Sequence, residues 1–367
     1  MSYYIGLMSG TSMDGVDAVL CQTQESTFTT LDAVSINYPA SLLDELNALC
    51  CTCENELNRT GQADVQVAGE FARAVNALLD KTGLRASDIC AIGSHGQTIR
   101  HFPDAGPGFT LQIGDPATLA VLTGIPVVAD FRRKDIALGG QGAPLAPGFH
   151  QAVFAAGEAR AIVNIGGIAN ISILPSAGAI PQGYDTGPGN TLMDKWIAAH
   201  QQRPFDENGQ WAASAGISQP LLNRLLNDPY FRLPAPKSTG REYFHAGWLQ
   251  RCLAEFDSVS PAQVQATLCQ FTATHIADAV QKAGYDIREV YVCGGGAFNR
   301  HLMQQIQALL PACTVATTQA LGLHPQQVEG AAFAWLAHAY FNKQPGNIPA
   351  VTGASRLAVL GGLYLPD

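Results

Sequence analysis

Apolar and polar positions alternate at the start of the chain and predict β-strands over residues 3–8, 16–22 and 28–38. The glycine-rich segment 9–15 joins the first two strands, so we expect a β-hairpin with an unusually polar turn. The same pattern returns around Gly166-Gly167, where strands over 161–165 and 168–174 predict a second hairpin of this kind.

Helical periodicity follows each hairpin. Val67, Phe71, Val75 and Leu78 share one face of a helix predicted over residues 63–81, which Gly83 ends. Further helices are expected over 115–122, 261–283 and 327–340, with another starting near Asn190, and further strands over 89–93, 125–128 and 290–293. Residues 138–148 are expected to form a loop. Strands that alternate with helices in both halves predict an α/β fold, and the repeated hairpin suggests a duplicated architecture.

Composition narrows the class of protein. A chain of 367 residues predicts about two domains. With 47% hydrophobic and 14% charged residues it is not a disordered chain. Its net charge of −9 argues against a nucleic-acid partner, because such binding requires cations for the phosphates.

The uncharged stretches 136–157 and 161–184 are interrupted by prolines and polar residues, so we expect no membrane span. The first residues do not resemble a signal peptide, and we expect a cytoplasmic protein with its nine cysteines reduced. The group Cys50, Cys51 and Cys53 lacks a second Cys pair, which disfavours a metal site.

Common catalytic motifs are missing from the sequence. It contains no P-loop, no complete G-x-G-x-x-G, no protein-kinase catalytic loop and no H-E-x-x-H. What remains is three glycine-rich turns, each directly after a predicted strand.

The first turn can bind phosphate. Glycine lets backbone N–H groups approach an anion, hydroxyls add donors, and two carboxylates are candidates for holding hydrated Mg²⁺. The candidate residues are Gly10, Thr11, Ser12, Met13, Asp14, Gly15, Val16 and Asp17. The alternative is a tight hairpin whose Ser and Asp residues only stabilise the turn.

The second and third turns extend the same chemistry. Asn164, Gly166 and Gly167 form the second, and beyond it Asp185 and Gly187 lie between a strand and a helix, where a carboxylate suits a general base. The third turn offers a flat surface for a purine, from Gly294, Gly295, Gly296 and Asn299. The alternatives are an Asp that caps a turn and a purely structural glycine turn.

The order of these turns is that of the actin-like, sugar-kinase and Hsp70 ATPase fold. The segments MSGTSMDGVD, SHGQT, ADFRRKDIALGGQGAPL, NIGGIAN, GYDTGPGN, CGGGAFN and VEGAAFAWLA together resemble the anhydro-N-acetylmuramic acid kinases, over essentially the whole chain. This resemblance implies two duplicated α/β domains with a cleft between them. The expected domains are 1–130, to which residues 345–367 return, and 131–344.

The resemblance also implies a reaction in peptidoglycan recycling. These kinases use ATP and Mg²⁺: water opens the 1,6-anhydro bridge at C1 of the sugar while O6 takes the γ-phosphoryl group, which gives N-acetylmuramic acid 6-phosphate. Asp185 matches their catalytic base and Glu329 an acidic substrate contact. His95 and Arg132 lie in segments that resemble the sugar side, and Arg132 suits the lactyl carboxylate.

The family further implies a homodimer. Two alternatives stay open: a kinase of this fold that acts on another amino sugar, and an ATP-gated module of the actin kind.

Overall fold

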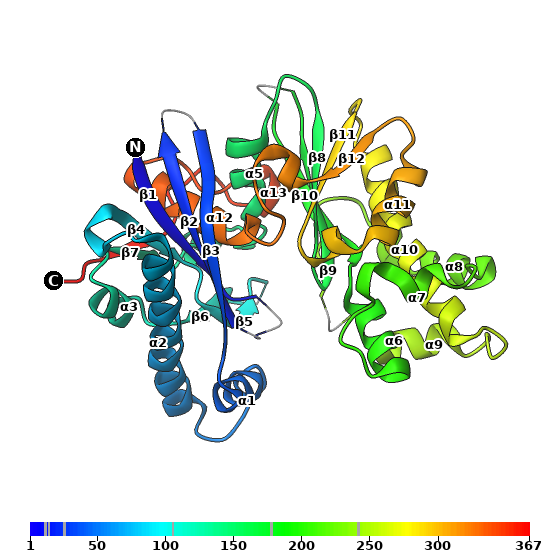
Figure 1. Ribbon diagram of the computed structural model, residues 1–367, viewed down its shortest axis with the longest axis horizontal. Helices are drawn as coiled ribbons and strands as arrows, with labels where there is room; N and C mark the ends of the chain where they lie inside the picture. Colours follow the sequence, from blue (N-terminus) through cyan, green and yellow to red (C-terminus); the bar gives the residue numbers. More distant parts are fainter. Residues whose placement is uncertain (11–12, 14, 25–26, 105, 177–178, 241–242) are drawn as a thin grey trace. The chain divides into compact units, whose positions relative to one another are not determined.

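The chain forms two compact units (Figure 1). The computed structural model describes all residues except 11–12, 14, 25–26, 105, 177–178 and 241–242. Unit 1 consists of Met1–Val153 and Gln327–Asp367, and unit 2 of Phe154–Gln326. The boundaries expected at residues 130/131 and 344/345 both fall inside unit 1. Packing explains the difference, because Phe149 contacts both Phe28 and Trp335 within this unit.

Unit 1 is built on a six-stranded mixed sheet of order β13-β7-β4-β1-β2-β3. The first three strands are antiparallel to one another, whereas β4 runs parallel to β1 and β7 parallel to β4. A separate two-stranded hairpin joins β5 and β6. The strands are β1 (Ser2–Met8), β2 (Gly15–Gln24), β3 (Thr27–Asn37), β4 (Ile89–Ser94), β5 (Gln97–Phe102), β6 (Phe109–Ile113), β7 (Val127–Ala129) and β13 (Gly362–Tyr364).

Helices cover both faces of this sheet. Ile5 and Leu7 of β1 point into a core shared with the long helix α2, whereas Tyr4 stacks edge-on against His338 of α12 at 5.3 Å. The helices of unit 1 are α1 (Ala40–Leu49), α2 (Glu56–Thr82), α3 (Pro116–Thr123), α4 (Arg133–Ala137), α5 (Ala146–Phe154), α12 (Val328–Phe341) and α13 (Pro349–Thr352).

Helix α12 lies directly on the backbone of the sheet because glycines remove the side chains between them. A Cβ on Gly6 would lie 1.8 Å from the carbonyl oxygen of Gly330, and one on Gly93 would lie 1.9 Å from that of Phe333. On the helix side, a Cβ on Gly330 would overlap Val19. These glycines hold residues 328–341 against strands that lie more than two hundred positions earlier in the chain.

Unit 2 repeats the strand order of unit 1 in a five-stranded sheet, β10-β9-β8-β11-β12. Its first three strands are again antiparallel, and β11 again runs parallel to the first strand of the unit. The predicted duplication is therefore present in the topology. The strands are β8 (Arg160–Ile165), β9 (Ile168–Leu174), β10 (Gln182–Pro188), β11 (Glu289–Cys293) and β12 (Thr314–Thr317).

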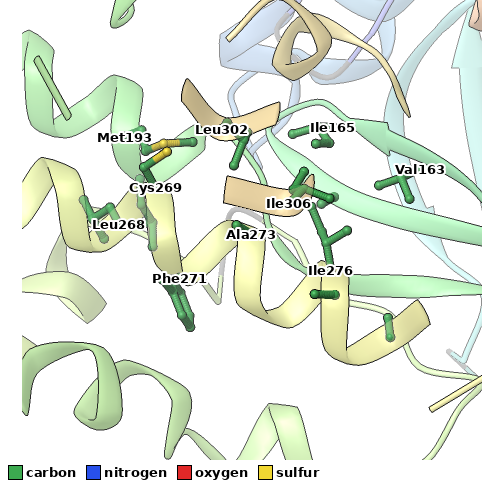
Figure 2. Packing of buried hydrophobic residues seen from close by; sticks show 14 of the residues in the cluster. Val163, Ile165, Met193, Leu268, Cys269, Phe271, Ala273, Ile276, Leu302 and Ile306 are labelled. Atoms are coloured by element: carbon green, nitrogen blue, oxygen red, sulfur yellow. The ribbon is translucent and has the colours of Figure 1, made fainter. Parts of the chain in front are cut away.

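The core of unit 2 lies between this sheet and its helices (Figure 2). Val163 and Ile165 of β8 point toward Ile276 of α10 and Ile306 of α11, and all four side chains are fully buried. The helices are α6 (Thr191–Gln201), α7 (Gln210–Ala213), α8 (Gln219–Leu226), α9 (Ala246–Leu253), α10 (Pro261–Gln281) and α11 (Arg300–Leu309).

Most predicted elements are confirmed, and the errors have physical reasons. The helix predicted over residues 63–81 starts seven residues earlier, at Glu56. The apolar pattern did not predict its first turns because they are exposed and carry no apolar stripe; Leu57, for example, is 86% exposed. The loop expected over 138–148 ends sooner, since α5 begins at Ala146. The β5–β6 hairpin was not predicted, because its strands are short and partly exposed.

The close contact between α12 and the sheet predicts that Gly93→Ala destabilises the protein by roughly 1–3 kcal/mol, the usual cost of overpacking a core. Gly61→Ala in α2 is the matched control, because nothing lies within 4 Å of the added methyl group. That change should stabilise the helix by about 0.5–1 kcal/mol. Urea unfolding measures both, and equal effects of the two substitutions would contradict the packing.

Candidate active site

The predicted phosphate-binding turn of unit 1 is anchored at its first residue. Ser9 is buried, and its Oγ accepts a hydrogen bond from Tyr38 Oη at 2.9 Å while lying 2.7 Å from the carbonyl oxygen of Gly15. Gln97 of β5 contacts Ser9 Oγ at 2.6 Å and donates to the carbonyl oxygen of Gly10. Both ends of the turn are therefore tied to buried polar groups.

The remaining predicted residues of this turn divide into three groups. Thr11, Ser12 and Asp14 lie outside the described residues. Met13 has a positive φ of 57°, and its sulfur lies 3.9 Å from Cys50 Sγ. The rest belong to β2, where Val16 is buried in the core and Asp17 accepts a hydrogen bond from Ser35 of β3.

In unit 1 the buried His95 is paired with the half-buried Arg132. Arg132 Nε and Nη2 both donate to His95 Nε2, at 3.1 and 2.9 Å, and Nη1 donates to the carbonyl oxygen of Gly142 at 2.8 Å. Since Nε2 accepts, the neutral ring carries its proton on Nδ1. Burial and the charge of Arg132 hold the pKa of His95 well below its usual range.

Glu329 lies close enough to this pair for its charge to affect the pKa of Arg132. Burial lowers the pKa of Arg132 to about 10, and the charges of Glu329 and Asp135 oppose that shift. Arg132 is thus still a cation at neutral pH. The structure brings together in unit 1 the three residues predicted to contact substrate, although they lie in β4–β5, the β7–α4 connection and α12.

A cavity of about 190 Å³ in unit 1 has His95 in its wall, with Asp130 and Arg133. Asp130 has a positive φ of 61°, a left-handed conformation that aspartate adopts more readily than most residues. Burial raises its pKa. The sequence analysis missed this residue; its position directly after a buried strand is the signal that was available.

In unit 2 the Gly166-Gly167 turn is hydrogen-bonded to the start of α6. The backbone N–H groups of Gly189 and Thr191 donate to Gly167, at 2.9 and 3.2 Å, and that of Asn190 donates to Gly166 at 2.8 Å. These carbonyl contacts fix the turn against the helix that follows β10.

The third glycine turn lies beside the second. A Cβ on Gly294 would lie 2.3 Å from Asn164 Oδ1, and one on Gly296 would overlap Ile165 of β8. At Gly187, likewise, Phe231 and His275 fill the space that a side chain would need. Packing therefore accounts for glycine at position 187.

Asp185 lies within β10, where the register with β9 shifts just after it. The segment 230–239 holds it at three atoms. Its N–H donates to the carbonyl oxygen of Lys237 at 3.0 Å, its carbonyl oxygen accepts from Tyr230 Oη at 2.6 Å, and Oδ2 accepts from the N–H of Thr239 at 3.0 Å. The carboxylate is thereby oriented by a segment about fifty residues away. These three partners were not predicted, because Tyr230, Lys237 and Thr239 belong to none of the glycine-rich turns or catalytic motifs of the sequence.

A pocket of about 380 Å³ lies within unit 2 beside the third turn. Gly295 and Asn299 line it, and Asn299 also caps α11 by accepting from the N–H of Leu302. Phe205 and Phe298 line it too, with 56% and 47% of their surface exposed. The other lining residues are Asn190, Met193, Asp194, Asp206, Asn208 and Gln326. Most of them lie outside the predicted turns.

Two units with one strand order, and with glycine turns at the ends of their central strands, define a protein of the actin-like, sugar-kinase and Hsp70 ATPase class. The family model described as anhydro-N-acetylmuramic acid kinase matches residues 2–366. The chain belongs to the anhydro-N-acetylmuramic acid kinase family, and it is a kinase, that is, a phosphotransferase.

Relatives of that name match over the full length. The anhydro-N-acetylmuramic acid kinase of Shewanella pealeana is 52% identical, with 100% of this chain and 99% of the relative covered. That of Shewanella baltica is 54% identical over 99% of this chain and 98% of the relative. Among solved structures, the activator of the 2-hydroxyisocaproyl-CoA dehydratase from Clostridium difficile aligns at a TM-score of 0.47 and 13% identity, covering 93% of this chain and 97% of that chain.

Two absences hold for the residues that the structure describes. They contain no helix that is long and apolar enough to cross a membrane. They also contain no group of three or more His, Cys, Asp or Glu side chains arranged to hold a metal ion.

Buried histidines predict an acid-sensitive fold. Burial lowers the pKa of His275 to about 4 and that of His150 to about 3. Between pH 6.5 and these values the unfolded chain binds protons that the folded chain does not, so the free energy of unfolding should fall as the pH falls through this window. Each group contributes a slope of up to about 1.4 kcal/mol per pH unit.

His275→Gln tests this dependence, because the amide can still donate to the carbonyl oxygen of Pro188, which His275 Nε2 contacts at 3.0 Å. Urea unfolding at pH 7.5 and pH 5.5 should show a smaller loss of stability on acidification in the variant. An unchanged loss would contradict the assignment.

Proposed function

We propose that this chain uses ATP to phosphorylate O6 of 1,6-anhydro-N-acetylmuramic acid while water opens the anhydro bridge. Water adds to C1, the C1–O6 bond breaks, and O6 takes the γ-phosphoryl group. The products are N-acetylmuramic acid 6-phosphate and ADP, so the enzyme acts in peptidoglycan recycling. The full-length family membership supports this reaction, and the oriented carboxylate of Asp185 is the observation that carries the mechanism.

Asp185 is the proposed general base. Its backbone is held on both sides and one carboxylate oxygen is held by Thr239, so the side chain has one preferred direction. A positioned carboxylate that removes a proton from water in the transition state contributes about 10²–10⁴-fold to the rate.

Arg132 is the proposed contact for the lactyl carboxylate of the sugar. Hydrogen bonds to His95 and Gly142 orient its guanidinium, and a guanidinium fork matches the two oxygens of a carboxylate. Partial burial strengthens such a pair relative to one in water. Glu329 and His95 are proposed to contact polar groups of the same sugar.

The 380 Å³ pocket of unit 2 is the proposed nucleoside site. The residues fit this group, because two exposed aromatic rings and the bare backbone of Gly295 provide apolar surfaces for a purine. Asn164, Gly166 and Gly167 are proposed to bind phosphate, and so, within unit 1, is the turn Gly10–Asp17. Gly294 and Gly296 extend the proposed nucleoside surface of Gly295, and Gly294 lies next to Asn164.

Mg²⁺ is proposed to bind together with ATP. This ion keeps several waters and usually binds one or two carboxylates plus the phosphates, so it needs no cage of protein ligands. When bound, it would neutralise charge on the transferred phosphoryl group. We also propose that the enzyme is a homodimer and that it is located in the cytoplasm.

Asp185→Asn tests the general base. The variant should lose at least about 100-fold in kcat while the KM for ATP stays within a factor of two, because the amide cannot take the proton. The assay incubates enzyme, ATP, Mg²⁺ and the anhydro sugar in ¹⁸O-water and weighs the sugar product.

Wild type should place one ¹⁸O at C1 of the 6-phosphate. Asp44→Asn, an exposed carboxylate on α1, is the matched control and should behave as wild type. Active Asp185→Asn would contradict the role of this residue. Transfer to another amino sugar, with none to the anhydro sugar, would contradict the substrate.

Phe298→Ala tests the nucleoside site. Loss of one stacking ring should raise the KM for ATP roughly tenfold, since stacking of a base on an aromatic ring is worth about 1–3 kcal/mol. The KM for the sugar should not change. Phe341→Ala, a ring on α12 that is 44% exposed, is the control, and equal effects of the two substitutions would place the nucleoside elsewhere.

A further inference from the structure

Asp135 is a fully buried carboxylate outside the residues proposed to touch a ligand. Its exposed fraction is 0%. Oδ1 accepts from Asn347 Nδ2 and from Thr352 Oγ1, both at 2.8 Å, and Oδ2 accepts from the N–H of Gly142 at 2.8 Å. Burial of a charge costs several kcal/mol unless the charge is hydrogen-bonded. These three hydrogen bonds therefore offset the cost of burying Asp135 and fix the direction of its carboxylate.

The hydrogen bond from Gly142 connects Asp135 to Arg132 through the backbone of a single residue. The N–H of Gly142 donates to Asp135, and the carbonyl oxygen of the same residue accepts from Arg132 Nη1 at 2.8 Å. The backbone of Gly142, with a φ of +67°, therefore lies between the buried carboxylate and the guanidinium. Asp135 also packs against the backbone of this segment, because a Cβ on Gly140 would lie 2.3 Å from Asp135 Oδ2.

The other two bonds tie the segment to the returning C-terminal part of unit 1. Thr352 lies in α13, and its carbonyl oxygen also accepts from the N–H of Gln141 at 2.7 Å. Asn347 accepts from the N–H of Ala358 through Oδ1 at 2.7 Å, so its amide is fixed as well. Residues 347–358 thus hold the loop that contacts Arg132 through several hydrogen bonds.

We propose that Asp135 is a positioning residue: through Gly142 it sets the direction of the Arg132 guanidinium for a carboxylate on the substrate. This inference rests on the proposed function. Asp135 itself does not touch the substrate, and its effect appears only with an acceptor that carries the carboxylate.

A ligand that lacks the carboxylate separates positioning from a general structural role. The assay compares the anhydro sugar acid with its methyl ester at the lactyl group, using wild type and Asp135→Asn. With the acid, the variant should raise the KM roughly tenfold, as for loss of a hydrogen bond to a charged group. With the ester, the kcat/KM of the variant and of wild type should agree within a factor of two, and the KM for ATP should not change.

A matched pair keeps the test valid if Asp135→Asn does not fold. Thr352→Val removes one donor to Asp135 at nearly constant volume, whereas Thr352→Ser keeps the hydroxyl. Thr352→Val should raise the KM for the acid several-fold, and Thr352→Ser should behave as wild type.

Three results would contradict the positioning role of Asp135 or the proposed function. An equal loss with acid and ester in the Asp135 and Thr352 variants would show a purely structural role and overturn the inference. Unchanged kinetics in folded Asp135→Asn would also overturn it. Wild type that transfers no phosphate to the acid would instead overturn the proposed function and, with it, the inference.

Discussion

The contact between α12 and the first sheet is the constraint on which unit 1 depends. Glycine at positions 6, 93 and 330 lets helix and strands meet backbone to backbone, so the helix lies closer than side chains would allow. The contact brings a segment from the end of the chain onto strands from its beginning. It is also what places the charge of Glu329 near Arg132.

Buried polar groups set the directions of the candidate functional side chains. Ser9 and Asp135 are buried and Asp185 is half-buried, and each is held by several hydrogen bonds from distant segments. Each bond offsets part of the cost of removing a polar group from water. Such networks have little freedom to rearrange, because an unmade buried hydrogen bond costs more than a made one contributes. The same physical requirement therefore stabilises the fold and orients the chemistry.

The two units carry different side chains on one topology. In each, the fourth strand of the repeat runs parallel to the first and ends in a turn with a glycine at positive φ: Gly96 after β4 and Gly294 after β11. In unit 1 this turn carries a buried histidine against an arginine. In unit 2 it carries a row of glycines beside a pocket. The two units thus differ in a few residues at equivalent places in the sheet.

The sequence by itself determined the elements with strong periodicity, the repeated hairpin and the residue types at the glycine turns, because these depend on neighbours along the chain. The face of α2 that Val67 and Phe71 share is one example. The tertiary structure decided what distant segments do together. The hold of residues 230–239 on Asp185, the Phe205 and Phe298 rings of one pocket, and the network of Asp135 with Asn347 and Thr352 have no local pattern. Each depends on contacts between residues tens to hundreds of positions apart, which only the folded chain brings together.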